Sequence, residues 1–160
     1  QVMPHRRQTG AIRDEERSAL LDLWVASWRA TYPTIDFDAR RAWFVDHLAE
    51  REAAGAALIC MFEDGAKPGE RKLLGFVLVD PKTGWLDQIA VKPNAFGAGV
   101  GRELLNAAKR ASPGKIRLDV NADNFRALRF YKREGFVRVG AGVNKLSGRE
   151  TAVLEWRREE

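Results

Sequence analysis

Three alternating glycines are the first feature of this sequence that could bind a ligand. Gly97, Gly99 and Gly101 follow the apolar segment Trp85–Val91 and stand directly before a helical pattern. Glycine leaves the main chain uncovered, so that N–H groups can approach a ligand closely. Free N–H groups and the helix dipole at a helix N-terminus favour an anion. The pattern predicts a pyrophosphate site at a strand-to-helix turn, with a plain turn as the alternative.

The glycine spacing differs from two familiar nucleotide-binding motifs. No Gly-Lys-Ser/Thr follows that could place a lysine on a γ-phosphate. The glycines fall as GxGxG rather than GxGxxG, and no early βαβ unit surrounds them. The segment resembles instead the acyl-CoA-binding motif of the GNAT superfamily of N-acetyltransferases, in which Arg/Gln-x-x-Gly-x-Gly/Ala opens a helix. The sequence departs from that motif at Phe96, where the family usually has Arg or Gln.

A second motif lies at the expected distance downstream. The stretch from Asn124 to Phe136 reads NFRALRFYKREGF and matches the family pattern Asn-x-x-Ala-x-x-Phe-Tyr-x-x-x-Gly-Phe. Two motifs in order are far more specific than one, and together they cover residues 85–136. The resemblance implies a cofactor site, in which backbone groups of the fourth strand pair with the pantetheine arm. Its residues would be Ile89, Ala90, Val91, Phe96, Gly97, Ala98, Gly99, Val100, Gly101, Arg102, Asn124 and Tyr131.

Acetyl transfer to an amine needs donors for the developing oxyanion, loss of the amine proton and an acid for the departing thiolate. Tyr131 stands where the family often has its general acid, with ring packing under the sheet as the alternative. Asp87 lies inside a predicted central strand, where an unpaired carboxylate is costly, and is therefore a candidate base. A salt bridge or an exposed strand end is the alternative. Asp80 and Asp119 are weaker candidates, and a water chain is a further route.

Aromatic residues near a predicted helix end are candidates for the acceptor pocket. In folds of the resembled kind, the first two helices and the last hairpin build this pocket. Trp28 and Tyr32, four residues apart beside Pro33, are candidates for its lining because they stand at a helix end, with core packing as the alternative. Asn121, just past a strand end, is expected to line the same gap or to form a plain turn. His47 is expected to be a surface or packing residue.

Hydrophobic periodicity and turn residues predict the elements that position these side chains. A first strand is expected within Val2–Ile12, and Asp38 is expected to cap the second helix. The other expected elements are, in order, helices Asp14–Thr31 and 38–52, strands Ala56–Phe62, Lys72–Asp80 and Trp85–Val91, a helix from the glycines to about Ala111, strand Lys115–Val120, a helix from Asn124 to Gly135, and strands Val137–Gly142 and Thr151–Trp156.

This order predicts an α/β fold with a mixed, mostly antiparallel sheet flanked by helices on both faces. It agrees with the GNAT fold, in which strands four and five splay apart and the cofactor enters the gap. The 160 residues, 45% apolar and 31% charged, are typical of one soluble globular domain. We therefore expect a single domain over residues 1–160.

Composition narrows the classes of partner. The net charge of +5 is dispersed along the chain, and a polyanionic cofactor such as coenzyme A explains it as well as nucleic acid does. The lone Cys60 excludes an internal disulfide, and with only His5 and His47 no metal cluster is visible. No apolar run is long enough to span a bilayer, and no secretory leader pattern opens the sequence. We expect a cytoplasmic protein without a membrane partner.

The sequence therefore predicts an N-acetyltransferase that moves an acetyl group from acetyl-CoA to a primary amine of a small molecule or a peptide. Transfer is expected to be direct, because no cysteine stands in a recognisable nucleophile motif. Two alternatives stay open, a non-catalytic acyl-CoA sensor and a basic nucleic-acid-binding domain. The identity of the acceptor and the formation of a homodimer also stay open.

Overall fold

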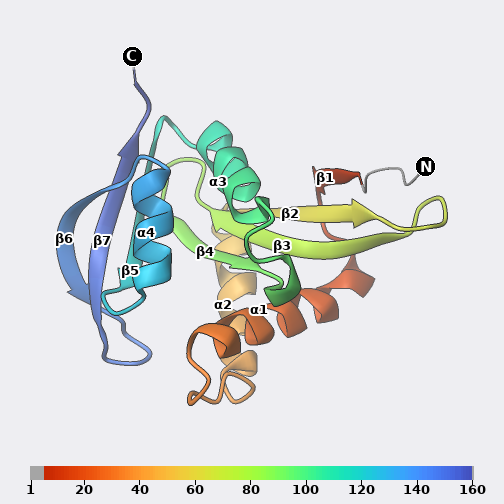
Figure 1. Ribbon diagram of the computed structural model, residues 1–160, viewed down its shortest axis with the longest axis horizontal. Helices are drawn as coiled ribbons and strands as arrows, with labels where there is room; N and C mark the ends of the chain where they lie inside the picture. The colour runs from red at the N-terminus through yellow and green to blue at the C-terminus, as the bar shows by residue number, and fades with distance from the viewer. Residues whose placement is uncertain (1–5, 160) are drawn as a thin grey trace.

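The computed structural model describes residues 6–159, which form two antiparallel sheets and the helices that cover them (Figure 1). The elements are, in order, β1 (Arg7–Gly10), the 3-10 turn η1 (Asp14–Glu16), α1 (Arg17–Thr31), α2 (Arg41–Ala53), β2 (Ala57–Asp64), β3 (Arg71–Val79), β4 (Leu86–Val91), the 3-10 turn η2 (Pro93–Ala95), α3 (Val100–Ala111), β5 (Lys115–Asn121), α4 (Phe125–Arg133), β6 (Val137–Val143) and β7 (Glu150–Arg157).

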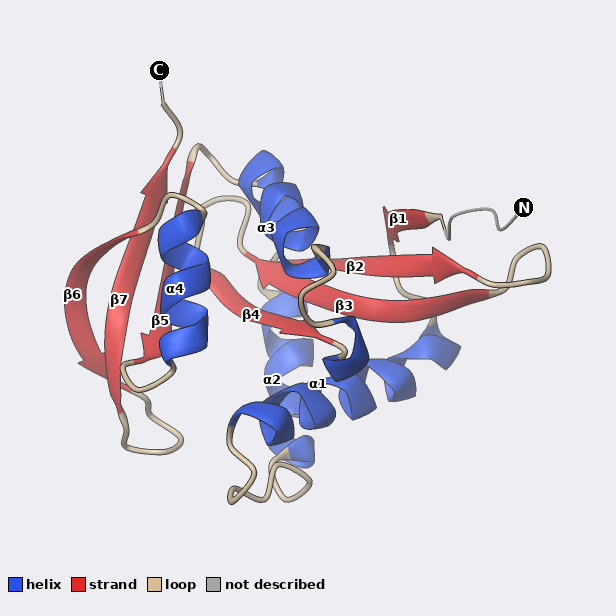
Figure 2. Cartoon of the chain, viewed as in Figure 1, coloured by secondary structure: helices blue, strands red, loops and turns tan. Residues whose placement is uncertain are grey.

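The two sheets diverge from one point of contact. One sheet has the strand order β1-β2-β3-β4 and the other β5-β7-β6. They meet at a parallel bridge between Trp85 and Arg117, where the Arg117 N–H donates to the Gly84 carbonyl at 3.0 Å. Beyond this bridge β4 and β5 run apart (Figure 2). The structure thus confirms the expected sheet and the splay between its fourth and fifth strands.

Strand β3 separates two hydrophobic cores. Side chains alternate between the faces of a strand, and Phe76 and Leu78 pack with α1 and α2 while Val77 and Val79 pack with α3. All four are fully buried, which explains the continuous apolar run of this strand. Figure 1 shows α1 and α2 on the side of the four-stranded sheet opposite to α3. Helix α4 packs with α3 and β5 in the core that contains Val77 and Val79.

The predicted N-cap at Asp38 is wrong. Helix α2 begins at Arg41 with Arg40 at the cap position, and no side chain caps it. The Asp38 carboxylate instead pairs with Arg29 of α1. Asp38 stands two residues before the cap position, in the turn of residues 38–40 that leads into the helix, and so cannot cap it. Part of the range predicted to hold the first strand, residues 2–5, lies outside the described residues, and β1 (Arg7–Gly10) lies within the remainder.

The ends of α4 follow the sequence signals. The Asn124 side chain accepts a hydrogen bond from the Ala127 N–H at 3.2 Å and caps the helix. At the other end Gly135 has φ of 91°, and the Phe136 N–H donates to the Tyr131 carbonyl at 3.0 Å. This is the expected left-handed termination, and it seats Phe136 against Tyr131. None of the described helices is long and apolar enough to cross a membrane.

Candidate active site

The gap between β4 and β5 forms a cleft of about 1130 Å³. Both strands, the end of α1, the start of α3, helix α4 and the hairpin between β6 and β7 contribute to its walls. The sequence-predicted residues that line it are Trp28, Asp87, Ile89, Ala90, Val91, Phe96, Gly97, Gly99, Gly101, Arg102, Asn121, Asn124 and Tyr131. The structure leaves Tyr32, Ala98 and Val100 outside this lining.

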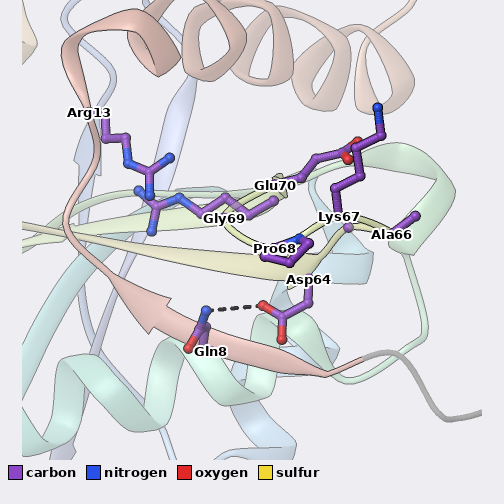
Figure 3. Close-up of a pocket in the computed structure, with 10 residues that line it drawn as sticks. Gln8, Arg13, Asp64, Ala66, Lys67, Pro68, Gly69 and Glu70 are labelled. Carbon is purple, nitrogen blue, oxygen red and sulfur yellow. Dashed lines mark hydrogen bonds between the residues drawn. The ribbon is translucent and has the colours of Figure 1, made fainter.

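A second, smaller hollow of about 340 Å³ lies at the hairpin between β2 and β3 (Figure 3). Its floor includes Gln8, whose amide donates to the Asp64 carboxylate at 3.1 Å, and Lys67 and Glu70 line the hairpin side. None of the residues of either sequence motif lines it. The cleft between β4 and β5 is therefore the candidate active site.

The glycine loop is shaped by backbone conformation rather than by crowding. Gly97 and Gly99 have φ of 81° and 85°, in the left-handed region that favours glycine. A Cβ added at either position meets no other atom within 4 Å. The N–H groups of the first turn of α3 have no intrahelical partner, and they stand beside this open space. The loop can therefore receive an anionic ligand.

Two loop residues support this arrangement from behind. Val100 is fully buried in the core beneath α3. The Ala98 carbonyl accepts a hydrogen bond from the Arg7 guanidinium at 2.8 Å, which ties the loop to β1. The buried Val100 side chain and the Ala98 carbonyl thus hold the loop in place, and neither residue lines the cleft.

The departure from the motif at Phe96 is accompanied by an arginine from another element. The guanidinium of Arg126, in the first turn of α4, lies 3.9 Å from the centre of the Phe96 ring. Both side chains line the cleft, and an arginine over an aromatic face is a favourable cation–π contact. The sequence analysis missed Arg126. The available signal was Phe96, an aromatic residue at the motif position that usually holds Arg or Gln, which suggests that a cation comes from elsewhere in the chain.

Tyr131 presents a neutral phenol to the cleft. Its ring is 5% exposed and packs edge-on against Phe130 and Phe136, with ring centroids 5.2 and 5.3 Å away. Burial raises the pKa of the Tyr131 phenol above its usual range. Within residues 6–159 no group hydrogen-bonds its hydroxyl. The ring thus packs in the core while the hydroxyl stays available as a proton donor.

Asp87 pairs with a histidine that the sequence reasoning had left as a surface or packing residue. The Asp87 Oδ1 atom lies 2.5 Å from Nε2 of His47 on α2, and the His47 ring stacks on Trp43. A bulge positions the pair, because β3 and β4 pair at Leu78 with Gln88 and then at Val79 with Leu86. Asp87 is the extra residue of that bulge. The side chains of Asp87 and His47 are 12% and 23% exposed, and of the two only Asp87 lines the cleft.

The other acidic candidates occupy different surroundings. The Asp80 carboxylate accepts hydrogen bonds from the Lys82 and Thr83 N–H groups in a turn, and the bond from Lys82 is the main reason that its pKa is lowered. Asp80 does not line the cleft. Asp119 does line it, and burial raises the pKa of its carboxyl group.

Of the two aromatic residues predicted for the acceptor pocket, Trp28 lines the cleft and Tyr32 stacks behind it with ring centroids 6.0 Å apart. The Tyr32 hydroxyl donates to Asp123 at 2.7 Å, and Arg149 donates to the same carboxylate at 2.8 Å. These bonds turn the phenol toward the loop before α4 and away from the cleft. Asn121, 8% exposed, remains in the lining.

Comparison with known proteins identifies the family. Residues 16–136 match the model of the Acetyltransferase (GNAT) family. The chain belongs to the GNAT family. It is 34% identical over 131 residues to a mycothiol acetyltransferase of Kineococcus radiotolerans, covering 78% of this chain but only 42% of that longer protein. It is 28% identical over 124 residues to the peptidyl-lysine N-acetyltransferase YjaB of Escherichia coli, covering 78% of each chain.

Solved structures carry the same GNAT fold. Apo YjaB from Escherichia coli superposes with a TM-score of 0.71 at 24% identity, covering 96% of this chain and 99% of that chain. The PaiA N-acetyltransferase from Thermoplasma acidophilum, in complex with coenzyme A, gives 0.70 at 16% identity, covering 95% and 99%. The predicted GNAT resemblance, the enzyme class of acetyltransferase and the use of acetyl-CoA are confirmed.

Proposed function

We propose that this chain transfers an acetyl group from acetyl-CoA directly to a primary amine of its acceptor, with both substrates bound together. The observation that carries the proposal is the cleft between β4 and β5. It joins an anion-receiving glycine loop, a buried phenol and a carboxylate in one space. Further support comes from YjaB, named as a peptidyl-lysine N-acetyltransferase, and from PaiA, whose structure contains coenzyme A. The cytoplasmic location and the homodimer remain predictions.

The cofactor would lie along β4 and across the start of α3. We assign the pyrophosphate to the N–H groups between Gly97 and Arg102, and the cation beside it to Arg126 in place of the usual motif residue. Beyond the bridge at Trp85, the edge of β4 that faces β5 has no strand partner among the described residues. Backbone groups of Ile89–Val91 are therefore free to hydrogen-bond the pantetheine amides.

The transfer step follows from the groups around the thioester. The amine nitrogen attacks the carbonyl carbon, a C–N bond forms and the C–S bond breaks. The departing thiolate takes the hydroxyl proton of Tyr131, and the amine proton passes to Asp87 directly or through water. His47 holds the Asp87 carboxylate in place from behind.

The surroundings of Cys60 favour direct transfer over an acyl-enzyme intermediate. The side chain is fully buried in the core below α1. Burial raises the pKa of the Cys60 thiol to about 12, so that the nucleophilic thiolate is scarce at neutral pH. Cys60 does not line the cleft.

Ligand binding and turnover test the proposal together. Acetyl-CoA at about 100 times its Kd should stabilise the folded chain by roughly 2.7 kcal/mol, seen as a rise in melting temperature. Gly99→Val, which forces a β-branched residue into a left-handed conformation beside the ligand, should remove that rise while the protein still folds. A screen of amines with acetyl-CoA then separates an enzyme from a sensor. Absence of any melting shift at millimolar acetyl-CoA would overturn the proposal.

A further inference from the structure

The acceptor side of the cleft holds two oxygen groups that no described residue uses, the Asp119 carboxylate and the Thr151 hydroxyl. We propose that they form a subsite for an ammonium or guanidinium group, so that the preferred acceptor carries a second cation besides the amine that is acetylated. The inference rests on the proposed function, and it names the chemical class of the acceptor.

Strand β5 directs Asp119 to the acceptor side. Ile116, Leu118 and Val120 are buried in the core with α3, so the alternate residues Asp119 and Asn121 face the opposite side of the sheet. Asp119 lines the cleft, and within residues 6–159 no group hydrogen-bonds or pairs with its carboxylate. The cation two residues before it on the same face, Arg117, is engaged by Glu155 at 3.3 Å.

Thr151 supplies the second, independent observation. It is 2% exposed, it lines the cleft, and its Oγ1 atom has no hydrogen-bond partner among the described residues. A buried hydroxyl without a partner is costly and requires an explanation. Thr151 pairs with Asn121 across β5 and β7, which makes it the diagonal neighbour of Asp119, about 7–8 Å away. A ligand that reaches Asp119 can therefore also satisfy Thr151.

The neighbouring strand β6 places no side chain directly against the Thr151 hydroxyl. Gly142 of β6 lies opposite Thr151, and a Cβ at position 142 would come within 3.0 Å of Oγ1. The other polar groups nearby are already engaged. Asn144 donates to the Asn121 Oδ1 atom at 3.4 Å, and the Tyr32 hydroxyl donates to Asp123 at 2.7 Å. Asp119 and Thr151 are thus left to bind a ligand.

The chemistry of the two free groups indicates a cation. An ammonium group has three donors and no acceptor, and a carboxylate beside a hydroxyl oxygen offers matching acceptors. Charge-assisted hydrogen bonds of this kind are stronger than neutral ones. Asp119 and Asp87 each lie two residues beyond the Trp85–Arg117 bridge, and both line the cleft. One cation of the acceptor would lie at Asp119 while the reacting amine lies near Asp87.

Lys145 is a positive charge in the same cleft lining as the proposed subsite, where it could compete with a cationic acceptor. Lys145, in the hairpin between β6 and β7, also lines the cleft. A flexible lysine in a surface loop can turn toward water, whereas Asp119 is fixed on a strand. Lys145→Ala should therefore keep the preference for a dicationic acceptor, and loss of that preference in this variant would contradict the proposal.

Paired acceptors test the subsite. We would compare butylamine with 1,4-diaminobutane, and a peptide with one lysine with a peptide with two adjacent lysines, at saturating acetyl-CoA. The dicationic member of at least one pair should have the higher kcat/KM, by about 10-fold or more. The pair with the larger ratio of dicationic to monocationic kcat/KM indicates whether the acceptor is a small diamine or a peptide.

Variants locate the preference. Asp119→Asn, Thr151→Val and Gly142→Ala should each reduce kcat/KM for the dicationic acceptor by a larger factor than for the monocationic one. Asp64→Asn, an acid in the small hollow outside the cleft, is the matched control and should change neither. Equal losses for both acceptors would overturn the proposal, because Asp119 would then receive only the reacting amine. Equal kcat/KM for both members of each pair in the wild type would overturn it as well.

A binding measurement separates this inference from the proposed function. Calorimetry of 1,4-diaminobutane and of the two-lysine peptide against the protein loaded with coenzyme A requires no turnover. Binding that is lost in Asp119→Asn would support the subsite even if no amine were acetylated. If the protein binds acetyl-CoA but neither binds nor acetylates any dicationic acceptor, the subsite is overturned and the cofactor site is still supported.

Discussion

Tyr131 allows the acid role and the packing role to be measured separately. Tyr131→Phe removes the hydroxyl and keeps the ring between Phe130 and Phe136. We expect kcat to fall by about 10²–10⁴, the usual contribution of general acid catalysis, with little change in acetyl-CoA affinity. Because burial raises the pKa of the phenol, the wild type should not lose its acid in the ordinary alkaline assay range. An unchanged kcat, with chemistry shown to limit the rate, would reduce Tyr131 to packing.

Asp87 is tested by its pH dependence. Asp87→Asn should lower kcat/KM at neutral pH, where an amine with a pKa of about 10 is almost entirely protonated. The deficit should shrink as pH rises, since more of the acceptor is already deprotonated. Asp80→Asn is the control, because Asp80 only accepts hydrogen bonds within a turn and should affect stability alone. A stable Asp87→Asn protein with the wild-type pH profile would exclude the base role.

The contact between Arg126 and Phe96 predicts a compensating pair of substitutions. Arg126→Gln should raise the KM for acetyl-CoA by about 10-fold or more, because charge-assisted hydrogen bonds are worth roughly 1.5–3 kcal/mol. Phe96→Arg in the same background returns a cation to the usual motif position and should restore much of the affinity. Normal acetyl-CoA binding by Arg126→Gln would show that the arginine only covers the Phe96 ring.

At the scale of residues, the sequence predicted many of the residues that line the cleft, but it did not predict the side chains that contact them. Motif spacing indicated Tyr131 and the glycines because their roles depend on local backbone geometry. The pairs of His47 with Asp87 and of Arg126 with Phe96 join residues that are distant in the chain. Only the packing of α2 beneath β4, and of α4 beside the glycine loop, brings these partners together, and no local pattern encodes it.

At the scale of elements, Asn124 separates helix capping from ligand contact. Asn124→Ala should lower the free energy of unfolding by about 1 kcal/mol, because the Ala127 N–H loses its partner. Asn124→Asp keeps a capping oxygen and should keep the stability, but it adds a negative charge to the cleft lining. Urea unfolding and acetyl-CoA titration of both variants report the two roles. Full acetyl-CoA affinity in Asn124→Asp would leave Asn124 as a cap alone.

The elements themselves were largely predictable, and their exceptions have local causes. The apolar run of β3 and the turn at Gly135 gave correct elements, since each pattern has one favourable structure. The start of α2 was misplaced because residues 38–40 form a turn, so that the helix begins at Arg41 and the Asp38 carboxylate pairs with Arg29 instead. The bulge at Asp87 was also missed, because it depends on how β3 and β4 align.

At the scale of the whole molecule, the two sheets share one bridge and open toward the cleft. Local hydrophobic patterns predict strands, but they do not say where a sheet separates. The splay was expected only from the resemblance to GNAT proteins, and in the structure a single bridge joins the two sheets before β4 and β5 separate. The cofactor would therefore occupy the place of a missing strand pairing.

This geometry predicts a localised effect of coenzyme A on amide hydrogen exchange. The N–H groups of Ile89–Val91 that face β5 lack strand partners, so they should exchange quickly in the free protein. Coenzyme A should slow them, together with the amides of the first turn of α3, because it would accept hydrogen bonds from both. Amides of α2 are the internal control, since that helix does not line the cleft. Mass spectrometry of peptides from both regions measures the difference. Equal protection of α2 and of the cleft edge would mean that the ligand acts through overall stability, and it would contradict a cofactor bound along β4.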